Sequence, residues 1–353
     1  GDTEVNIYAN SVHLSAALNL GEALNHLETD VATVAATVSE GGIYVTESTG
    51  LVLGTVTDVV VNQIATNGSA SLTAAGTTLS GVSVTTDTGN GSNDDVVLVN
   101  KLGSLSVNQA VMIAGNGNIR LEAQAGLLTI NKAITSETGH ISLLAGGDMV
   151  FADEGDVSTG SGGVNGDIHV HVTGTDNTLT MADDTVFTTN SGALRLASTG
   201  SITLGQLDAR SSSDRSGDTL TNQNTWGSVS LISASGAIVD AGAEGNTSVD
   251  IYSHDLRLHA AESIANNDKQ LAIETLGLSA LATLGGLYIT EQTDLSLAST
   301  SVTTELVQTD GSITSVIDGA QDNLISGADL VLIASAGSIT TAATGAVSAA
   351  GNL

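Results

Sequence analysis

Short segments along the chain begin at a glycine and then alternate between aliphatic and other residues. Alternation with a period of two indicates a β-strand that buries one face. Between Gly117 and Gly192 successive segments start 22, 27 and 26 residues apart, a spacing typical of the coils of a solenoid. The segments begin at Gly41, Gly68, Gly117, Gly139, Gly166, Gly192, Gly227 and Gly285.

Within each segment the aliphatic residues share one face, which we expect to form the core of the solenoid. The residues between them are expected to point to solvent; these are Arg120, Ser142, His169, Arg195 and Ser230. Further strands of each coil are predicted where other apolar runs follow a glycine corner, at 127–130, 201–204 and 237–239.

Two Ala- and Leu-rich stretches, 13–38 and 258–284, resemble helices in composition. Apolar residues on a helix recur three and four positions apart, whereas Leu276, Leu278 and Ala280 fit alternation at least as well. Both stretches are therefore predicted to be coils of the solenoid.

A longer repeat contains these coils. The sequence GGIYVTE at 41–47 returns as GGLYITE at 285–291, 244 positions later, and the flanking residues match at nearly the same offset over about 70 residues. The chain is therefore predicted to be a single rod over 1–353, made of one long unit at 2–245 and part of a second copy at 246–353.

Together these patterns predict an all-β chain folded as a parallel β-helix of about 15 coils, each of roughly 20–27 residues. Coils that stack about 4.8 Å apart would make a rod roughly 70 Å long. Stretches rich in Gly, Ser, Asn and Asp at 84–95, 152–166 and 210–225 are expected to be surface loops.

The chain carries 38 acidic and 8 basic residues, a formal net charge of −30. Binding to nucleic acid requires clustered Lys and Arg, so nucleic acid is not an expected partner. The same charge disfavours docking on anionic lipid. An acidic exterior favours solubility and could collect divalent cations. The chain contains no cysteine, and no apolar stretch is long enough to span a bilayer. Residues 1–20 do not have the pattern of a signal peptide, so we expect any targeting segment to lie outside the chain.

No cofactor is expected, and Ca²⁺ is the one ion that short acidic motifs could bind. The sequence GGVNGD at 162–167 is near to a calcium-binding nonapeptide, but its glycine spacing is one place off, which favours a turn. The acidic pairs at 94–95 and 183–184 could supply oxygen ligands, although solvation is the simpler interpretation. His169 and His171 share a strand face, but two histidines alone do not form a metal site.

The chain is not expected to be an enzyme. Catalysis requires an acid, a base or a nucleophile placed together, and no such cluster is visible. Arg120 and Arg195 stand among otherwise neutral outward positions.

The long repeat places Tyr44 and Thr46 on the outer face of one strand, and Tyr288 and Thr290 at the same places in the second copy. An exposed tyrosine once per unit could contact a cell-surface glycan, a partner protein or a neighbouring rod. The alternative is that each tyrosine packs beneath a local loop.

The segments GSVSLISASGAIVDAG (227–242), DLRLHAAESI (255–264) and DLVLIASAGSITTAATG (329–345) resemble the filamentous-haemagglutinin-like repeats of very large bacterial surface and secreted proteins. The resemblance extends over nearly the whole chain and implies a right-handed parallel β-helix, exported from a Gram-negative cell and associated with its outer surface. It implies a role in adhesion but identifies no functional residue.

The leading hypothesis is therefore a structural and adhesive segment of a giant surface or secreted protein, which attaches through many weak contacts along a rigid rod. The first alternative is a polysaccharide lyase or hydrolase on a β-helix. The second is a passive stalk or sheath filament without a ligand.

Overall fold

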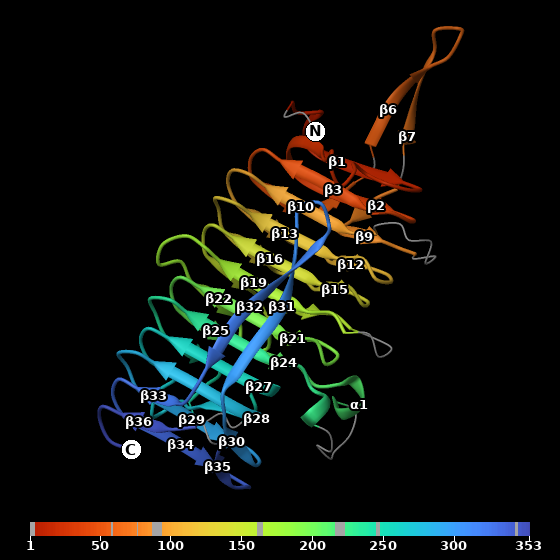
Figure 1. Ribbon diagram of the computed structural model, residues 1–353. Coiled ribbons are helices and arrows are strands. Elements are labelled where there is room, and N and C mark those ends of the chain that lie inside the picture. Colours follow the sequence, from red (N-terminus) through yellow and green to blue (C-terminus); the bar gives the residue numbers. More distant parts are fainter. Residues whose placement is uncertain are drawn as a thin grey trace.

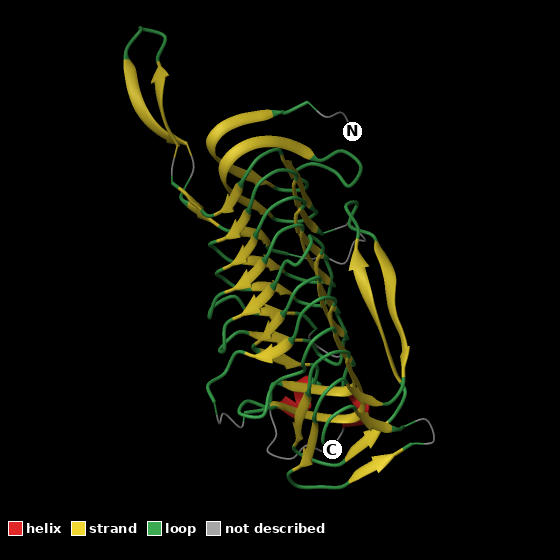
Figure 2. Cartoon of the chain, turned by 90° about the vertical axis from the view of Figure 1, so that its left-hand side faces the viewer, coloured by secondary structure: helices red, strands yellow, loops and turns green. Residues whose placement is uncertain are grey.

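The computed structural model describes residues 4–57, 59–75, 77–86, 94–160, 165–215, 223–244, 248–342 and 345–353. The chain folds as an elongated parallel β-helix, in which each coil stacks on the coil before it (Figures 1 and 2). The predicted all-β solenoid is confirmed. Among the described residues, no helix is long and apolar enough to cross a membrane.

Strands of successive coils stack in register and form three columns. In the first column Ile43 pairs with Val96, and Val96 pairs with Ile119. Its central members are β3 (Ile43–Glu47), β10 (Val96–Asn100), β13 (Ile119–Ala123), β16 (Ile141–Ala145), β19 (Ile168–Val172), β22 (Leu194–Ser198) and β25 (Val229–Ser233). They include the alternating segments that the glycine pattern predicted.

The other two columns are built from short strands. The second contains β4 (Leu51–Leu53), β11 (Leu105–Val107), β14 (Leu128–Ile130), β17 (Met149–Phe151), β20 (Leu179–Met181), β23 (Ile202–Leu204) and β26 (Ile238–Asp240). The third contains β9 (Val82–Val84), β12 (Val111–Ile113), β15 (Ile134–Ser136), β18 (Val157–Ser158), β21 (Val186–Thr188) and β24 (Gln206–Asp208). The strands predicted near 127–130, 201–204 and 237–239 therefore form the second column.

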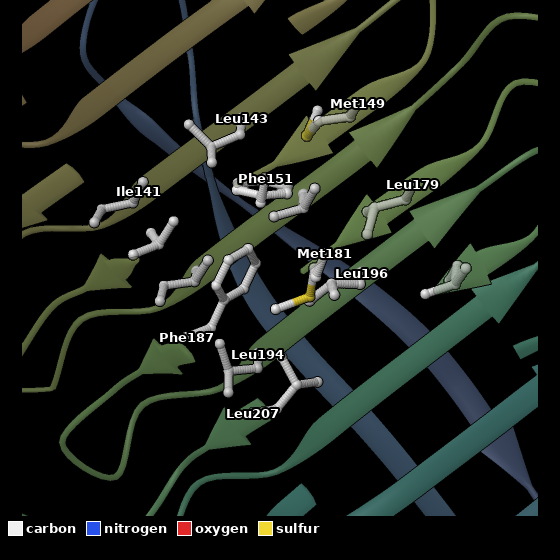
Figure 3. Close-up of a cluster of buried hydrophobic side chains, with 14 of the residues drawn as sticks. Ile141, Leu143, Met149, Phe151, Leu179, Met181, Phe187, Leu194, Leu196 and Leu207 are labelled. Carbon is white, nitrogen blue, oxygen red and sulfur yellow. The ribbon is translucent and has the colours of Figure 1, made fainter. Parts of the chain in front are cut away.

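The inward residues of all three columns make one continuous aliphatic core along the rod. Both phenylalanines of the chain, Phe151 and Phe187, meet edge to face in this core, with their ring centroids 4.8 Å apart (Figure 3). Met149 and Met181 fill the space beside them. No coil encloses its own side chains, so each coil depends on its neighbours for burial.

Long strands lie where the two Ala-rich stretches occur. Residues 13–38 include the end of β1 (Ile7–Ala16) and all of β2 (Leu27–Val38), which pair in parallel. Residues 258–284 contain the end of β27 (Ile251–Ala260) and β28 (Leu271–Ala282), and these also pair in parallel. The prediction that both stretches are coils and not helices is confirmed.

The 244-residue repeat is visible strand by strand. The strands β1, β2, β3 and β4 begin 244 positions before β27, β28, β29 (Leu287–Glu291) and β30 (Leu295–Leu297), and their lengths are identical. The rod then ends in strands that continue the columns. These are β33 (Leu324–Ser326), β34 (Leu330–Ala334), β35 (Ile339–Thr341) and β36 (Val347–Ala349).

Each copy also contains an antiparallel hairpin outside the stack. The first pairs β6 (Val59–Ile64) with β7 (Ala70–Ala75), above the small pair β5 (Thr55–Val56) and β8 (Leu79–Ser80). The second pairs β31 (Thr300–Val307) with β32 (Ile313–Gln321). The prediction of a core strand beginning at Gly68 is wrong, because Gly68 has a φ of 78° in the hairpin turn and the strand that follows it pairs with β6 outside the stack.

The loop predicted at 210–225 contains the short helix α1 (Ser212–Arg215) and a 3₁₀ turn, η1 (Gln223–Thr225). Parts of all three predicted loops, 87–93, 161–164 and 216–222, lie outside the described residues.

The glutamate that ends each copy of the seven-residue repeat is buried beside the long strands. Glu47 accepts hydrogen bonds from the hydroxyl of Thr29 at 2.6 Å and from the backbone N–H of Val31. Glu291 accepts from the backbone N–H groups of Thr275 and Thr293. Ile273 stands where Thr29 does, so the second glutamate receives no hydroxyl donor at that position.

Burial raises the pKa of Glu291 from 4.5 to about 7. The folded state then binds the proton more tightly than the unfolded chain does, so the free energy of unfolding should fall as the pH rises from about 4.5 to about 7. We expect Glu291→Gln to remove this loss and to gain about 1–3 kcal/mol relative to the native chain between these two pH values. Urea unfolding at several pH values measures the difference, and the exposed Glu262→Gln is the control. A difference that does not change with pH would contradict the assignment.

Loss of a core aromatic ring should open the rod locally. Phe187→Ala leaves a cavity beside Phe151 and should destabilise the surrounding coils by about 3–5 kcal/mol. Amide exchange should accelerate in β17, β18, β20 and β21 before it does so in distant coils, because each coil contacts only its neighbours. The exposed Tyr8→Ala should leave these rates unchanged.

Candidate functional site

The outward positions of the first column form a continuous surface, which we call the first face. Its members, from the N-terminal side, are Tyr44, Val97, Arg120, Ser142, His169, Arg195, Ser230, Arg257 and Ser279. The prediction that five of these residues are exposed is wrong, since Arg120, Ser142, His169, Arg195 and Ser230 are all at most 9% exposed. They do point away from the core, but the β31–β32 hairpin covers them.

The hairpin leaves the rod near its C-terminal end and lies back across the coils toward the N-terminal end (Figures 1 and 2). At its base, the side-chain amide of Gln321 donates to the carbonyl of Leu258 at 2.9 Å. Near its tip, the backbone N–H of Val307 donates to the hydroxyl of Ser142 at 2.8 Å, and Asn118 donates to the carbonyl of Gly311. The hairpin is thus joined along its length to residues that lie between 63 and 193 positions away in sequence.

Three of the eight basic residues of the chain lie under the hairpin. The guanidinium of Arg195 donates to the carboxylate of Asp318 at 3.0 Å, and both groups are buried. Arg120 donates to the carbonyl of Val307 as well as to Glu122, and Arg257 donates to the carbonyl of Gly319. These cations therefore hold the hairpin, and a buried cation that lost its partner would be costly.

His169 occupies the centre of the first face. Its Nδ1 lies 3.1 Å from the hydroxyl of Thr304, and burial beside Arg195 lowers its pKa to about 3. Burial also lowers the pKa of His171 on the same strand. Both rings are therefore neutral at physiological pH. Across the described part of the chain, no group of three or more His, Asp or Glu side chains is placed to hold a metal ion.

Tyr44 lies under the tip of the hairpin and is only 2% exposed. Its hydroxyl donates to Asp95 at 2.9 Å, and its ring lies against that of His26. The tyrosine does point outward, as predicted, but it is not open to an external ligand. Gly311, from the second copy of the repeat, covers Tyr44 together with residues close to it in sequence.

The other three predicted contact residues are half-buried. Thr46 lies 2.9 Å from Nδ1 of His26, and Thr290 donates its hydroxyl to Gln270. Tyr288 packs against the core of the second copy. The structure brings Tyr44 and Thr46 together and, separately, Tyr288 and Thr290, but it does not bring the two pairs together.

The acidic pair at 94–95 belongs to the surface on which the tip of the β31–β32 hairpin docks. Asp94 accepts from the backbone N–H of Gly41 at 2.6 Å, and Asp95 accepts from that of Asn118 as well as from Tyr44. Burial raises the pKa of Asp95. The pair at 183–184 is exposed, and residues 162–164 lie outside the described part of the chain.

Hollows lie on both sides of the hairpin tip and on another side of the rod. One, of about 580 Å³, is lined by Thr46, Lys101 and Asp310 among others, and a second of about 710 Å³ lies beside Asp95 and Asn118. A groove of about 530 Å³ runs along the outward side of the third column. Its lining includes Ser83, Met112, Thr135, Ser158 and Thr188 from successive coils. The groove offers hydroxyl groups, a methionine and the carboxylate of Glu137.

Comparison with known proteins found no matching family model, no matching curated protein and no matching solved structure.

The hairpins are the structural feature that the sequence pattern did not predict. Both contain a signal for a tight turn between apolar runs, Asn67-Gly68 in the first and Asp310-Gly311 in the second. Such dipeptides are the strongest local indication of a hairpin. The alternation that follows each glycine matches the pattern of the core strands. The hairpin strands therefore cannot be distinguished from core strands by this pattern.

The buried pair between Arg195 and Asp318 should be critical for docking. We expect Arg195→Met alone, or Asp318→Asn alone, to weaken hairpin docking by about 3–5 kcal/mol, because each leaves a buried polar group without its partner. The double variant should recover part of this loss. Amide exchange in β31 and β32 measures the docking. The exposed pair Lys132–Glu154 is the control, and its loss should change exchange by less than about 1 kcal/mol. Additive single effects would contradict direct coupling.

Proposed function

We propose that this chain is a segment of a very long adhesive rod on the surface of a bacterial cell, or secreted from it. In this role the β-helix provides stiffness and reach, and attachment comes from many weak contacts repeated along the rod. The observation that carries the proposal is the 244-residue repeat, in which strands β1 to β4 recur as β27 to β30 with the stack unbroken between them.

The docked hairpin supports a mechanical role. Hydrogen bonds between stacked coils run along the rod, so tension along the rod pulls on them directly. The strands β31 and β32 cross several coils lengthwise and are fixed at both ends and in the middle (Figure 1). A strap in this orientation ties the second copy of the unit to the first across their junction.

The groove along the third column supports an adhesive role. Its hydroxyl groups recur coil after coil, on Ser83, Thr135, Ser158 and Thr188, and so could make repeated hydrogen bonds to a glycan or an extended peptide. The net charge of −30 favours a neutral or basic partner over an acidic one. Contact through Tyr44 is not part of this proposal, because the hairpin covers that residue.

The passive stalk is the second candidate, and the extent of the docked hairpin favours it as much as the first. The lyase or hydrolase alternative has less support. Within the described residues, the lining of the groove includes a single carboxylate, that of Glu137, where general acid–base cleavage of a polysaccharide requires two catalytic groups.

Attachment can be measured with beads that carry the chain. We expect them to bind epithelial or bacterial cells, with avidity that rises steeply with the density of chains on the bead. Thr135→Trp combined with Ser158→Trp fills the groove and should lower the number of bound beads at least about fivefold, since the loss at each chain multiplies over many contacts. Thr203→Trp, at an outward position of the second column, is the matched control. Folded chains that never attach at any density would favour the passive stalk.

A further inference from the structure

The two hairpins of the chain are the same module in two states. Val61 pairs with Thr73 in the first hairpin, and Thr304 pairs with Val316 in the second. Val61 and Thr73 lie 243 positions before Thr304 and Val316, and the offset holds along the paired residues of β6 and β7. The two hairpins therefore have the same register around the turn, although β31 and β32 are longer than β6 and β7.

The turns of the two hairpins also agree in detail. Asn67 accepts hydrogen bonds from the N–H and the hydroxyl of Ser69, and Asp310 accepts the same two bonds from Ser312. The next residue in each turn is a glycine with positive φ, 78° in the first and 81° in the second. A turn preserved at this level indicates that both hairpins derive from one structural element of the repeat.

Only the second hairpin docks on the surface of the rod. The first projects away from the rod, beyond β1 (Figures 1 and 2). Its Val61 and Ile64 are 47% and 65% exposed, whereas their counterparts Thr304 and Val307 are both 0% exposed against the first face. The side that the second hairpin buries is thus apolar and open to solvent on the first.

Strand β1, in the same copy of the repeat as the first hairpin, is also paired on one edge only. Among the described strands β1 pairs with β2 alone, whereas its counterpart β27 pairs with β28 on one side and with β24 and β25 on the other. Leu14 is partly exposed, while Leu258 at the same place in the second copy is 0% exposed. A preceding coil of the same kind would complete β1 as β24 and β25 complete β27.

We propose that the β6–β7 hairpin is a docking arm that lies along the first face of another copy of the repeat unit, stacked on the open edge of β1. Each unit then straps the unit before it, as β31–β32 straps the first copy here. The occupant of the exposed hairpin is therefore a β-helical unit of this same type. This assignment goes beyond the proposed adhesive role and does not depend on it.

The sequence of the β6–β7 arm indicates which side chains the face that it docks on should carry. Val61 stands where Thr304 bonds to His169, and Asn62 stands at the position of Glu305. Ala75 has the place of Asp318, the partner of Arg195. An arginine at the position of Arg195 would lose its carboxylate under the first arm, so the matching face is apolar or neutral there.

A graft within the full chain tests the arm directly. Residues 302–318 are replaced by residues 59–75, a segment of equal length, once with Arg195 retained and once with Arg195→Met. With Arg195→Met we expect the grafted arm to dock and its amides to exchange at least about 100-fold more slowly than those of β6–β7 in the native chain. With Arg195 retained, the protection should be at least about tenfold weaker. Unchanged exchange in β13, β16 and β19 verifies that the rod is folded.

A longer chain tests the arm in its proposed setting, and serves if the graft does not fold. Residues 2–245, with Arg195→Met and His169→Cys, are placed directly before residue 2 of the full chain, which carries Val61→Cys. The chain has no other cysteine, so any disulfide reports this contact. In the native chain, Thr304→Cys with His169→Cys is the positive control, because these residues touch. Val61→Cys with His169→Cys there is the negative control.

Protection of the arm, together with the disulfide in the longer chain, is the expected result. An arm that remains unprotected in whichever chain folds, and forms no disulfide in the longer chain while the positive control does, overturns the proposal. That result would assign the exposed hairpin to a different partner. Bead attachment is measured on the native chain, so failure of the adhesive role and failure of the docking arm are separate outcomes.

Discussion

The stacking of coil upon coil is the constraint on which the rest of this structure depends. Each coil presents aliphatic residues to the inside of a narrow rod, and only the coils above and below complete their burial. The parallel ladder fixes the register, because Ile43, Val96, Ile119 and Ile141 must follow one another in a row. A core with two phenylalanines and one tryptophan in 353 residues is sufficient because the rows interlock and bulky side chains are not required.

This constraint explains what could be predicted from the sequence. Alternation after a glycine reports which side of a strand faces the core, and that question is local, so the columns and the Ala-rich strands could be predicted. The fate of the outward residues is not local. Arg195 and His169 are buried by Asp318 and Thr304, which lie more than 120 positions away, and no pattern near the arginine indicates this. Tyr44 was predicted to point outward for a sound reason, but its cover includes residues from the second copy of the repeat.

The sequence is enough to predict that the two hairpins exist, but not where they lie relative to the rod. An Asn-Gly or Asp-Gly turn between apolar runs predicts a hairpin, and both copies have one. Whether a hairpin lies on the rod or extends from it depends on which surface is within reach. The module is nearly the same in both copies, while the neighbouring surface differs, so a sequence taken one repeat at a time carries no information on the docked state.

The positions of the charged residues also decide which hairpin can dock on a given copy of the repeat. The chain has few cations, and three of them lie on the first face, where they meet a carboxylate or carbonyl groups of the second hairpin. Placing an arm without Asp318 on this face would bury Arg195 without a partner, a cost that opposes the wrong pairing. Copies of a repeat that differ at such positions are not interchangeable. A rod assembled from similar coils could otherwise slip by whole units, because aliphatic rows match almost any neighbour. The polar contacts under the β31–β32 hairpin therefore add a specificity that the hydrophobic stack lacks.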